Sequence, residues 1–86
     1  MRSLAKTVTT TASKIVDAEP VNRQIYVHVV GNNIVYLGNS AITTAAGFPT
    51  EKGGVPLAIT IPINETLWAR TVSVTEDIRI LLPDGA

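Results

Sequence analysis

The chain has 86 residues, no cysteine and one histidine, which excludes disulfide bonds, thiolate metal sites and a multi-histidine metal centre within one chain. Lysine plus arginine equals aspartate plus glutamate at seven each, and this balance argues against nucleic-acid and anionic-membrane partners, which basic proteins bind. Charged residues make up only 16%, against roughly 25% in ordinary soluble domains, and a domain this small has a marginal core. We therefore expect oligomerisation, or docking on a larger body, to cover part of a weakly charged surface.

The first part of the chain carries no targeting pattern. No apolar run approaches the roughly 18–20 residues of a transmembrane helix, and residues 1–14 lack the apolar core of a signal peptide, so we expect neither. Residues 1–12 are rich in threonine and are predicted as an extended amino-terminal arm or a first strand. Residues 13–86 are predicted as a single β-sandwich domain, which begins with a short strand at 13–18.

The segment 23–30 shows the most regular alternation, with aliphatic side chains on one face and polar or aromatic side chains on the other. The following Gly-Asn-Asn at 31–33 contains residues that tolerate positive φ, which predicts a tight hairpin turn. Residues 34–38 are then the returning strand. In the strand predicted at 23–30, the side chains expected to face inward are Ile25, Val27 and Val29.

The second half of the chain continues the β pattern. Along 55–63 two sets of side chains alternate, and proline cannot donate a ladder hydrogen bond, so this segment is predicted as an edge strand with its proline-bearing face outward. The inward set is Val55, Leu57, Ile59, Ile61 and Ile63, and the outward set is Pro56, Ala58, Thr60 and Pro62. Segments 66–72 and 77–83 are predicted as the last two strands. Turn signals at 8–12-residue spacing, with almost no helical periodicity, predict an all-β fold: a small antiparallel β-sandwich or barrel of about six to eight short strands.

The polar residues form no catalytic or metal-binding pattern. His28 has no nucleophile and no orienting carboxylate at a recognisable spacing, so we interpret it as a surface or subunit-contact residue. Glu76 and Asp77 are the only adjacent acids, and a solvated turn is favoured because calcium needs several oxygen ligands. We expect no enzyme activity, no metal and no cofactor. This elimination favours a binding or structural module.

The aromatic and arginine residues leave alternatives open. Trp68 is predicted to pack in the core, since a sugar-binding platform needs two or three aromatic side chains exposed on one face. Arg23, Arg70 and Arg79 lie in predicted strands. Ion pairs with neighbouring subunits and solvated strand faces are equal alternatives for these three arginines.

Several short motifs occur in a fixed order over residues 13–82, nearly the whole chain. They are Asn22-Arg23, Val35-Tyr36-Leu37-Gly38, Gly47-Phe48-Pro49, Gly53-Gly54, Leu67-Trp68-Ala69 and Asp77-Ile78-Arg79-Ile80-Leu81. In this order they resemble a small β-module of tailed-bacteriophage structural proteins, which is found in capsid decoration proteins and in fibre and tail-associated proteins. Val74 in the last turn and the two prolines of the aliphatic strand depart from that pattern.

The resemblance implies a decoration, or cement, protein that binds the outer surface of a phage capsid and stabilises the head. Its partners would be the major capsid protein and further copies of itself, commonly as a homotrimer, with no nucleic acid and no membrane. The protein would be made in the host cytoplasm and located on the capsid surface of the virion. The alternative is a tail- or fibre-associated attachment module that binds host glycans.

The stretch 34–50 contains no charged residue, and within it 38–50 is predicted as a loop that lies against another protein. Small residues in such a loop permit close approach of two backbones. The threonine-rich amino terminus is expected to become ordered on the capsid or on a neighbouring subunit. The candidate protein-contact residues are Thr7, Thr9, Thr10, Asn39, Ser40, Thr43, Thr44 and Phe48.

Overall fold

The computed structural model describes residues 1–53 and 56–83. Within them every regular element is a strand, so the predicted all-β class is confirmed and no helix is present. The predicted Gly54 of the glycine turn, the inward Val55 and the end of the domain at 84–86 lie outside the described residues. The strands are β1 (Arg2–Val8), β2 (Ser13–Val16), β3 (Arg23–Val29), β4 (Val35–Gly38), β5 (Phe48–Thr50), β6 (Leu57–Ile61), β7 (Leu67–Arg70) and β8 (Glu76–Leu82).

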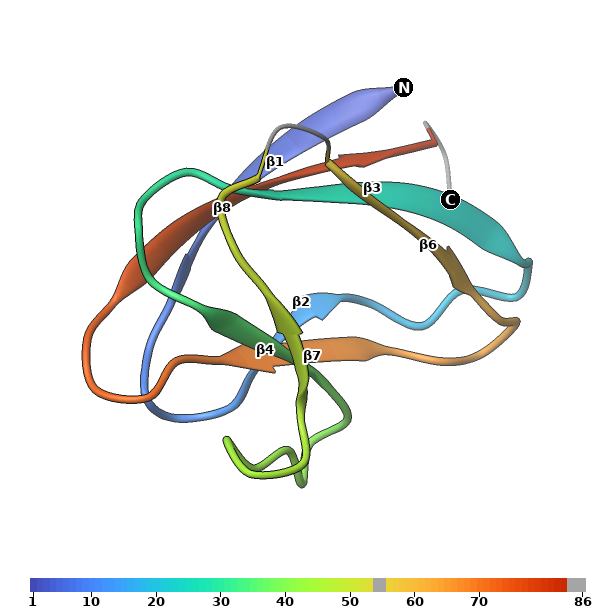
Figure 1. Cartoon of the computed structure of the whole chain (residues 1–86). Helices are drawn as coiled ribbons and strands as arrows, with labels where there is room; N and C mark the ends of the chain where they lie inside the picture. The colour runs from blue at the N-terminus through green and yellow to red at the C-terminus, as the bar shows by residue number, and fades with distance from the viewer. Residues whose placement is uncertain (54–55, 84–86) are drawn as a thin grey trace.

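The strands form two antiparallel four-stranded sheets that lie one above the other as a sandwich (Figure 1). The first sheet has the order β1-β8-β3-β6 and the second β2-β7-β4-β5. Strands β1 and β2 are therefore the edges on one side of the sandwich, and β6 and β5 are the edges on the other. Residues Arg2–Val8, within the segment expected to be an extended arm or a first strand, form an edge strand that pairs along its whole length with β8.

One apolar core lies between the sheets, and the period-two alternation of the strands builds it. In β8 every second residue is buried, and the inward positions of β3 are buried as predicted. Each fully buried Val, Leu or Ile side chain contributes about 1.5–3 kcal/mol relative to exposure, so this core is the main source of stability. Its buried members are Val8, Ile15, Val16, Ile25, Val27, Val29, Val35, Leu37, Ile61, Leu67, Ala69, Ile78, Ile80 and Leu82.

Six of the seven connections between the eight strands pass from one sheet to the other. The exception is the link between β4 and β5, which are neighbours in the second sheet. The predicted hairpin at 31–33 is therefore wrong, because β3 has β6 and β8 on its two sides and β4 lies in the opposite layer. The glycine and asparagines turn the chain across the end of the sandwich instead.

A buried carboxylate holds this crossing in place. Glu76 is only 7% exposed, and its Oε2 accepts hydrogen bonds from the backbone N–H of Gly31 at 3.0 Å and of Asp77 at 2.9 Å, while Oε1 accepts from Asn33 at 2.8 Å. A Cβ on residue 31 would overlap this carboxylate, which explains the glycine. The N–H donors, that of Asn33 foremost, hold the pKa of Glu76 below its ordinary value despite burial, which acts in the opposite direction. The predicted solvated turn is therefore wrong, because Glu76 is buried, and Asp77, although exposed, lies in strand β8 opposite Thr7.

The opposite end of the sandwich is closed by a buried cation. Arg23 is 3% exposed on the inner face of β3, and its Nη1 and Nη2 donate to the backbone carbonyls of Asp17 at 2.6 Å and Glu65 at 3.1 Å. These carbonyls belong to two different crossings, β2–β3 and β6–β7. Both alternatives expected for Arg23, a solvated face and an intersubunit ion pair, are wrong because the guanidinium satisfies loop carbonyls inside the fold.

Two further hydrogen bonds tie the same pair of crossings together. The Asn64 N–H donates to the Glu19 carbonyl at 2.8 Å, and the Ile63 N–H donates to Asn22 Oδ1 at 2.7 Å. Asn64 has a positive φ of 64°, a conformation that asparagine tolerates better than most residues. This turn ends β6 at Ile61, so Ile63, which was expected inward, lies exposed.

Strand β6 lies at a sheet edge, as predicted from its prolines. Pro56 and Pro62 lie just outside the strand, and its side chains that face the core are Leu57, Ile59 and Ile61.

The predicted loop at 38–50 is shorter than expected. Its last three residues form β5, which pairs with β4 and completes the second sheet.

We expect Glu76→Gln to lower the free energy of unfolding by about 2 kcal/mol at pH 7, since hydrogen bonds to a charged group contribute about 1.5–3 kcal/mol. The native pKa is lowered, so the stabilisation is present above the ordinary pKa near 4.5 and disappears as the pH falls through the native value. Urea unfolding measured from pH 7 down to pH 3 should show that the difference in free energy of unfolding between wild type and variant decreases as the pH falls. The exposed Glu51→Gln serves as control, and a pH-independent difference would contradict this role.

Arg23→Lys should destabilise the protein by about 2–3 kcal/mol, because one ammonium group cannot reproduce two diverging hydrogen bonds from a planar guanidinium. The matched control is Arg79→Lys on the exposed outer face of β8, for which we expect a change below about 0.5 kcal/mol. Chemical denaturation of both variants measures the difference. Equal effects at the two positions would show that Arg23 does not act through its two carbonyl partners.

Candidate functional site

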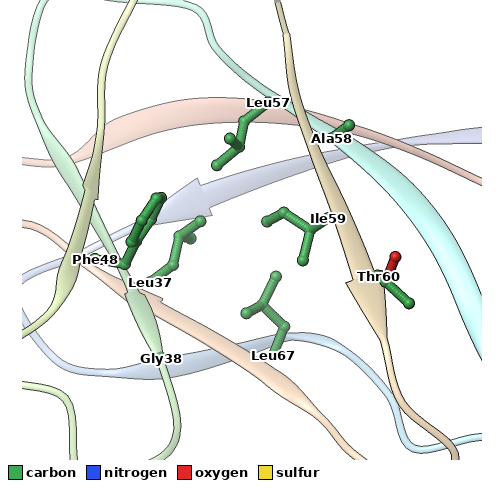
Figure 2. A pocket seen from close by; sticks show the side chains of 8 residues that line it. All are labelled: Leu37, Gly38, Phe48, Leu57, Ala58, Ile59, Thr60 and Leu67. Atoms are coloured by element: carbon green, nitrogen blue, oxygen red, sulfur yellow. The ribbon is translucent and has the colours of Figure 1, made fainter.

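The sandwich opens into an apolar cavity of about 410 Å³ on the side of β5 and β6. Figure 2 shows Leu57 and Ile59 of β6 pointing toward Leu37, Phe48 and Leu67 of the second sheet, while Ala58 and Thr60 point the other way. Cavities of about 300–1,000 Å³ lined by apolar side chains are the usual size of binding sites. The lining residues are Leu37, Gly38, Phe48, Leu57, Ala58, Ile59, Thr60 and Leu67.

The cavity exists because the core thins toward this edge. On β3, Ile25 and Val27 are fully buried, but their register partners on β6, Ile59 and Leu57, are only half-buried. A five-residue edge strand and the three-residue β5 do not bring enough side chains to close the space between the sheets. Phe48, on β5, is 59% exposed at the rim of the cavity.

The loop between β4 and β5 is ordered by its own hydrogen bonds. The Asn39 carbonyl and its Oδ1 accept from the N–H groups of Ile42 at 3.1 Å and Ala41 at 2.9 Å. Thr43 likewise accepts twice, its carbonyl from Gly47 at 2.7 Å and its Oγ1 from Ala46 at 3.1 Å. These turns satisfy the backbone groups of the loop locally and leave their outer surface available for contact.

Close packing of Gly47 completes this loop. A Cβ there would lie 2.8 Å from both the Thr43 carbonyl oxygen and the Tyr36 Cβ, so only glycine fits without a shift of the backbone. A second hollow of about 360 Å³ lies inside the loop and shares Leu37 and Gly38 with the first. None of the residues that line either hollow is charged. We call this continuous surface, formed by the two hollows, the uncharged side.

The structure places five of the eight candidate contact residues on or beside the uncharged side. Asn39 and Thr43 line the loop hollow, Phe48 lines the apolar cavity, and Ser40 and Thr44 belong to the same loop. The aliphatic floor of the cavity cannot be read from the sequence, because alternation predicts which residues face the core and not where the core is uncovered. The floor consists of Leu37, Leu57, Ile59 and Leu67.

The three amino-terminal threonines lie elsewhere. Thr7 is on the outer face of β1, where its hydroxyl donates to Asp77 Oδ1 at 2.9 Å. Thr9 lies in the β1–β2 crossing, and its carbonyl accepts from the Thr71 N–H at 2.9 Å. Thr10 is exposed in the same crossing. These threonines and the β4–β5 loop therefore do not form one surface.

The aromatic side chains are divided among three surfaces. Trp68 is half-buried on the outer face of the second sheet and donates through Nε1 to Thr66 Oγ1 at 3.1 Å, so the predicted core position is wrong. Its neighbours Leu67 and Ala69 occupy the core because side chains alternate along the strand. Tyr36 shares the outer face of Trp68, Phe48 lines the cavity, and Tyr26 lies exposed on the outer face of the first sheet.

His28 lies on the outer face of β3, as the alternation predicted, directly opposite Arg79 of β8. Within residues 1–53 and 56–83 no group of three histidine, aspartate or glutamate side chains is placed to hold a metal ion. The same residues include no helix that is long and apolar enough to cross a membrane. His28 shares the outer face of the first sheet with Tyr26, Arg79 and Leu81, a face that is partly apolar and partly cationic.

Comparison of the chain with protein-family models, with curated proteins and with solved structures finds no significant match. The function of the protein is therefore inferred from its own residues and from the geometry of the uncharged side.

Substitution should distinguish the floor of the cavity from its rim. Leu37→Ala removes a buried side chain and should cost about 2–4 kcal/mol of stability, as large-to-small core substitutions do. Phe48→Ala removes an exposed side chain and should change stability by less than about 1 kcal/mol. Urea unfolding of both variants tests this. A large loss for Phe48→Ala would mean that Phe48 is part of the core and is not available to a partner.

Proposed function

We propose that this protein is a structural virion protein, a capsid decoration protein of a tailed bacteriophage, which binds the outer surface of the shell and stabilises it. The motif order of the chain supports the phage assignment, and the uncharged side supports action by protein contact. The observation that carries the proposal is the continuous apolar cavity and polar, uncharged loop on one side of the sandwich. Apolar surface of this kind on a small domain is typical of a protein-binding site.

The contact would work through burial of apolar surface. Phe48 and the aliphatic floor supply an apolar centre, and Asn39 and Thr43 supply polar groups beside it, which is the usual arrangement of a protein interface. A standard interface covers about 800 Å² per partner, roughly a sixth of the 4,933 Å² accessible surface of this chain. One side of the sandwich is therefore large enough for the contact.

Each contact of this size need not be tight. If the protein assembles as a homotrimer, three copies present three contacts to neighbouring major capsid proteins at once. The second and third contacts then form at a high effective concentration, so modest individual affinities add up to stable attachment. A lattice of such attachments resists the outward pressure of packaged DNA because each trimer holds several shell subunits together.

Glycan binding by a tail- or fibre-associated module is the competing function. It requires a platform of exposed aromatic side chains, and Trp68 with Tyr36 is the one pair of described aromatic residues on a common face. Both are half-buried, and the other two described aromatic side chains face different surfaces. The distribution of aromatic residues therefore favours protein contact over sugar stacking.

We expect Phe48→Asp to abolish binding to undecorated capsids at concentrations that saturate binding of the wild-type protein, since a carboxylate would be buried against apolar surface. The matched control is Val72→Asp, which adds the same charge at an equally exposed apolar position in the β7–β8 crossing. Cosedimentation with capsids and electron cryomicroscopy of the particles measure occupancy. Thermal unfolding of both variants checks that they are folded.

Three outcomes would reject parts of the proposal. If the wild-type protein does not bind capsids and localises to the tail tip, the decoration role is wrong. If the protein binds capsids but only Val72→Asp loses binding, the contact lies at the end of the sandwich that holds the β7–β8 crossing. Loss of binding to cell-wall glycans in Trp68→Ala, with capsid binding absent in the wild type, would favour the attachment module.

A further inference from the structure

A further groove, of about 350 Å³, lies on the outer face of the first sheet. It crosses the two central strands of that sheet, β3 and β8. None of the residues that line it lines either hollow of the uncharged side, so the groove is independent of the proposed capsid contact. The exposed or half-buried residues that line it are Ser3, Tyr26, His28, Pro56, Arg79 and Leu81.

The strand register arranges the groove as two rows of side chains. Tyr26 of β3 lies opposite Leu81 of β8, and each of these two apolar side chains is 39% exposed. His28 lies opposite Arg79, two residues from the first pair along each strand. Residues on one face of a strand are roughly 6.5–7 Å apart, so a row of hydrogen-bond donors lies one such step from an apolar row.

Arg79 has donors that are free to bind a ligand. Its side chain is exposed, and its one hydrogen bond within residues 1–53 and 56–83 runs from Nη1 to the Ile78 carbonyl at 3.2 Å. A guanidinium has several further N–H donors, and they are accessible here because the side chain is exposed. His28 adds an N–H donor beside them, since an imidazole carries at least one in either protonation state.

The acidic residue of this face does not pair with Arg79. Asp77 is the one acid at the outward positions of the four strands in the described chain, and it lies outside the lining of the groove. Its Oδ1 accepts from the Thr7 hydroxyl at 2.9 Å, and no ion pair joins it to Arg79. The donor row is therefore complementary in charge to a carboxylate from outside the chain.

We propose that this groove binds an acidic peptide segment of a partner protein, with a carboxylate on Arg79 and His28 and an apolar side chain on Tyr26 and Leu81. An extended peptide repeats its same-face side chains at the same step of roughly 6.5–7 Å, so the apolar and acidic residues of the ligand are two positions apart. Arginine binds a carboxylate through parallel N–H bonds, and this is the strong polar contact of the site. The tyrosine ring supplies rigid apolar contact area beside it.

The experiment titrates the full ¹⁵N-labelled chain with the blocked peptide acetyl-Leu-Ala-Glu-Ala-amide at pH 7. Two matched peptides carry Gln in place of Glu, or Ala in place of Leu, and sodium chloride keeps the ionic strength constant. The readouts are the backbone ¹H–¹⁵N resonances of Tyr26, His28, Arg79 and Leu81, together with the Nε–H resonance of Arg79.

We expect saturable shifts of these resonances with the Glu peptide. The Gln and the Ala peptides should each bind about tenfold more weakly, because each lacks one of the two contacts. Arg79→Gln should weaken binding of the Glu peptide about tenfold and remove its advantage over the Gln peptide. The matched control is Arg70→Gln, on the outer face of the second sheet, which should leave binding unchanged.

Three results would overturn the site. If the Glu peptide shifts none of these resonances, the groove does not bind peptide. Equal affinities of the Glu and Gln peptides would show that no carboxylate is recognised. An equal loss of affinity in Arg70→Gln and Arg79→Gln would show that net charge, and not the groove, attracts the peptide. The first two results come from the wild-type chain, so they hold even if a variant folds poorly.

Discussion

The structure depends on buried charged side chains that bind the backbone of connections between the two sheets. Six of the seven connections cross from one sheet to the other, and only β4 and β5 form a hairpin of consecutive strands. The backbone groups of the crossing connections are therefore not paired by a hairpin turn. Glu76 accepts three N–H groups at one end, and Arg23 donates to two carbonyls at the other. In both cases the charged group is hydrogen-bonded to dipoles of the main chain. These hydrogen bonds lower the free-energy cost of burying the charge.

This arrangement leaves the two open sides of the sandwich with different properties. The core thins at β5 and β6, where the sheet edges carry aliphatic and small side chains, and an uncharged surface results. At β1 and β2 the edge strands carry arginine and lysine, and the same lack of a covering strand produces a small basic cavity. Lysine in β1 and β2, and proline in β5 and on both sides of β6, hinder the pairing of these edges with strands of other chains, so a partner on the uncharged side would contact side chains instead.

The small core and the long sequence separation between paired strands both limit the stability of the fold. Apart from β4 and β5, all paired strands are far apart in the sequence, and this separation raises the entropy cost of loop closure during folding. The core supplies the driving force, but an 86-residue domain buries limited apolar area. A partner on the uncharged side would add apolar burial, and it would stabilise the fold if it binds only the native state.

The sequence by itself determined the class of the fold. Period-two alternation predicts which side chains of β3, β6 and β8 face the core, and this prediction does not depend on the order of the strands in the sheets. It also predicted β6 as an edge, since proline removes ladder donors. Tertiary structure alone decided that residues 31–33 cross between layers, that Trp68 lies outside the core, and that Arg23 and Glu76 are buried. The physical reason is that alternation is a local property, whereas pairing and burial depend on which distant strand lies opposite, and a charged residue is buried wherever distant backbone groups satisfy it.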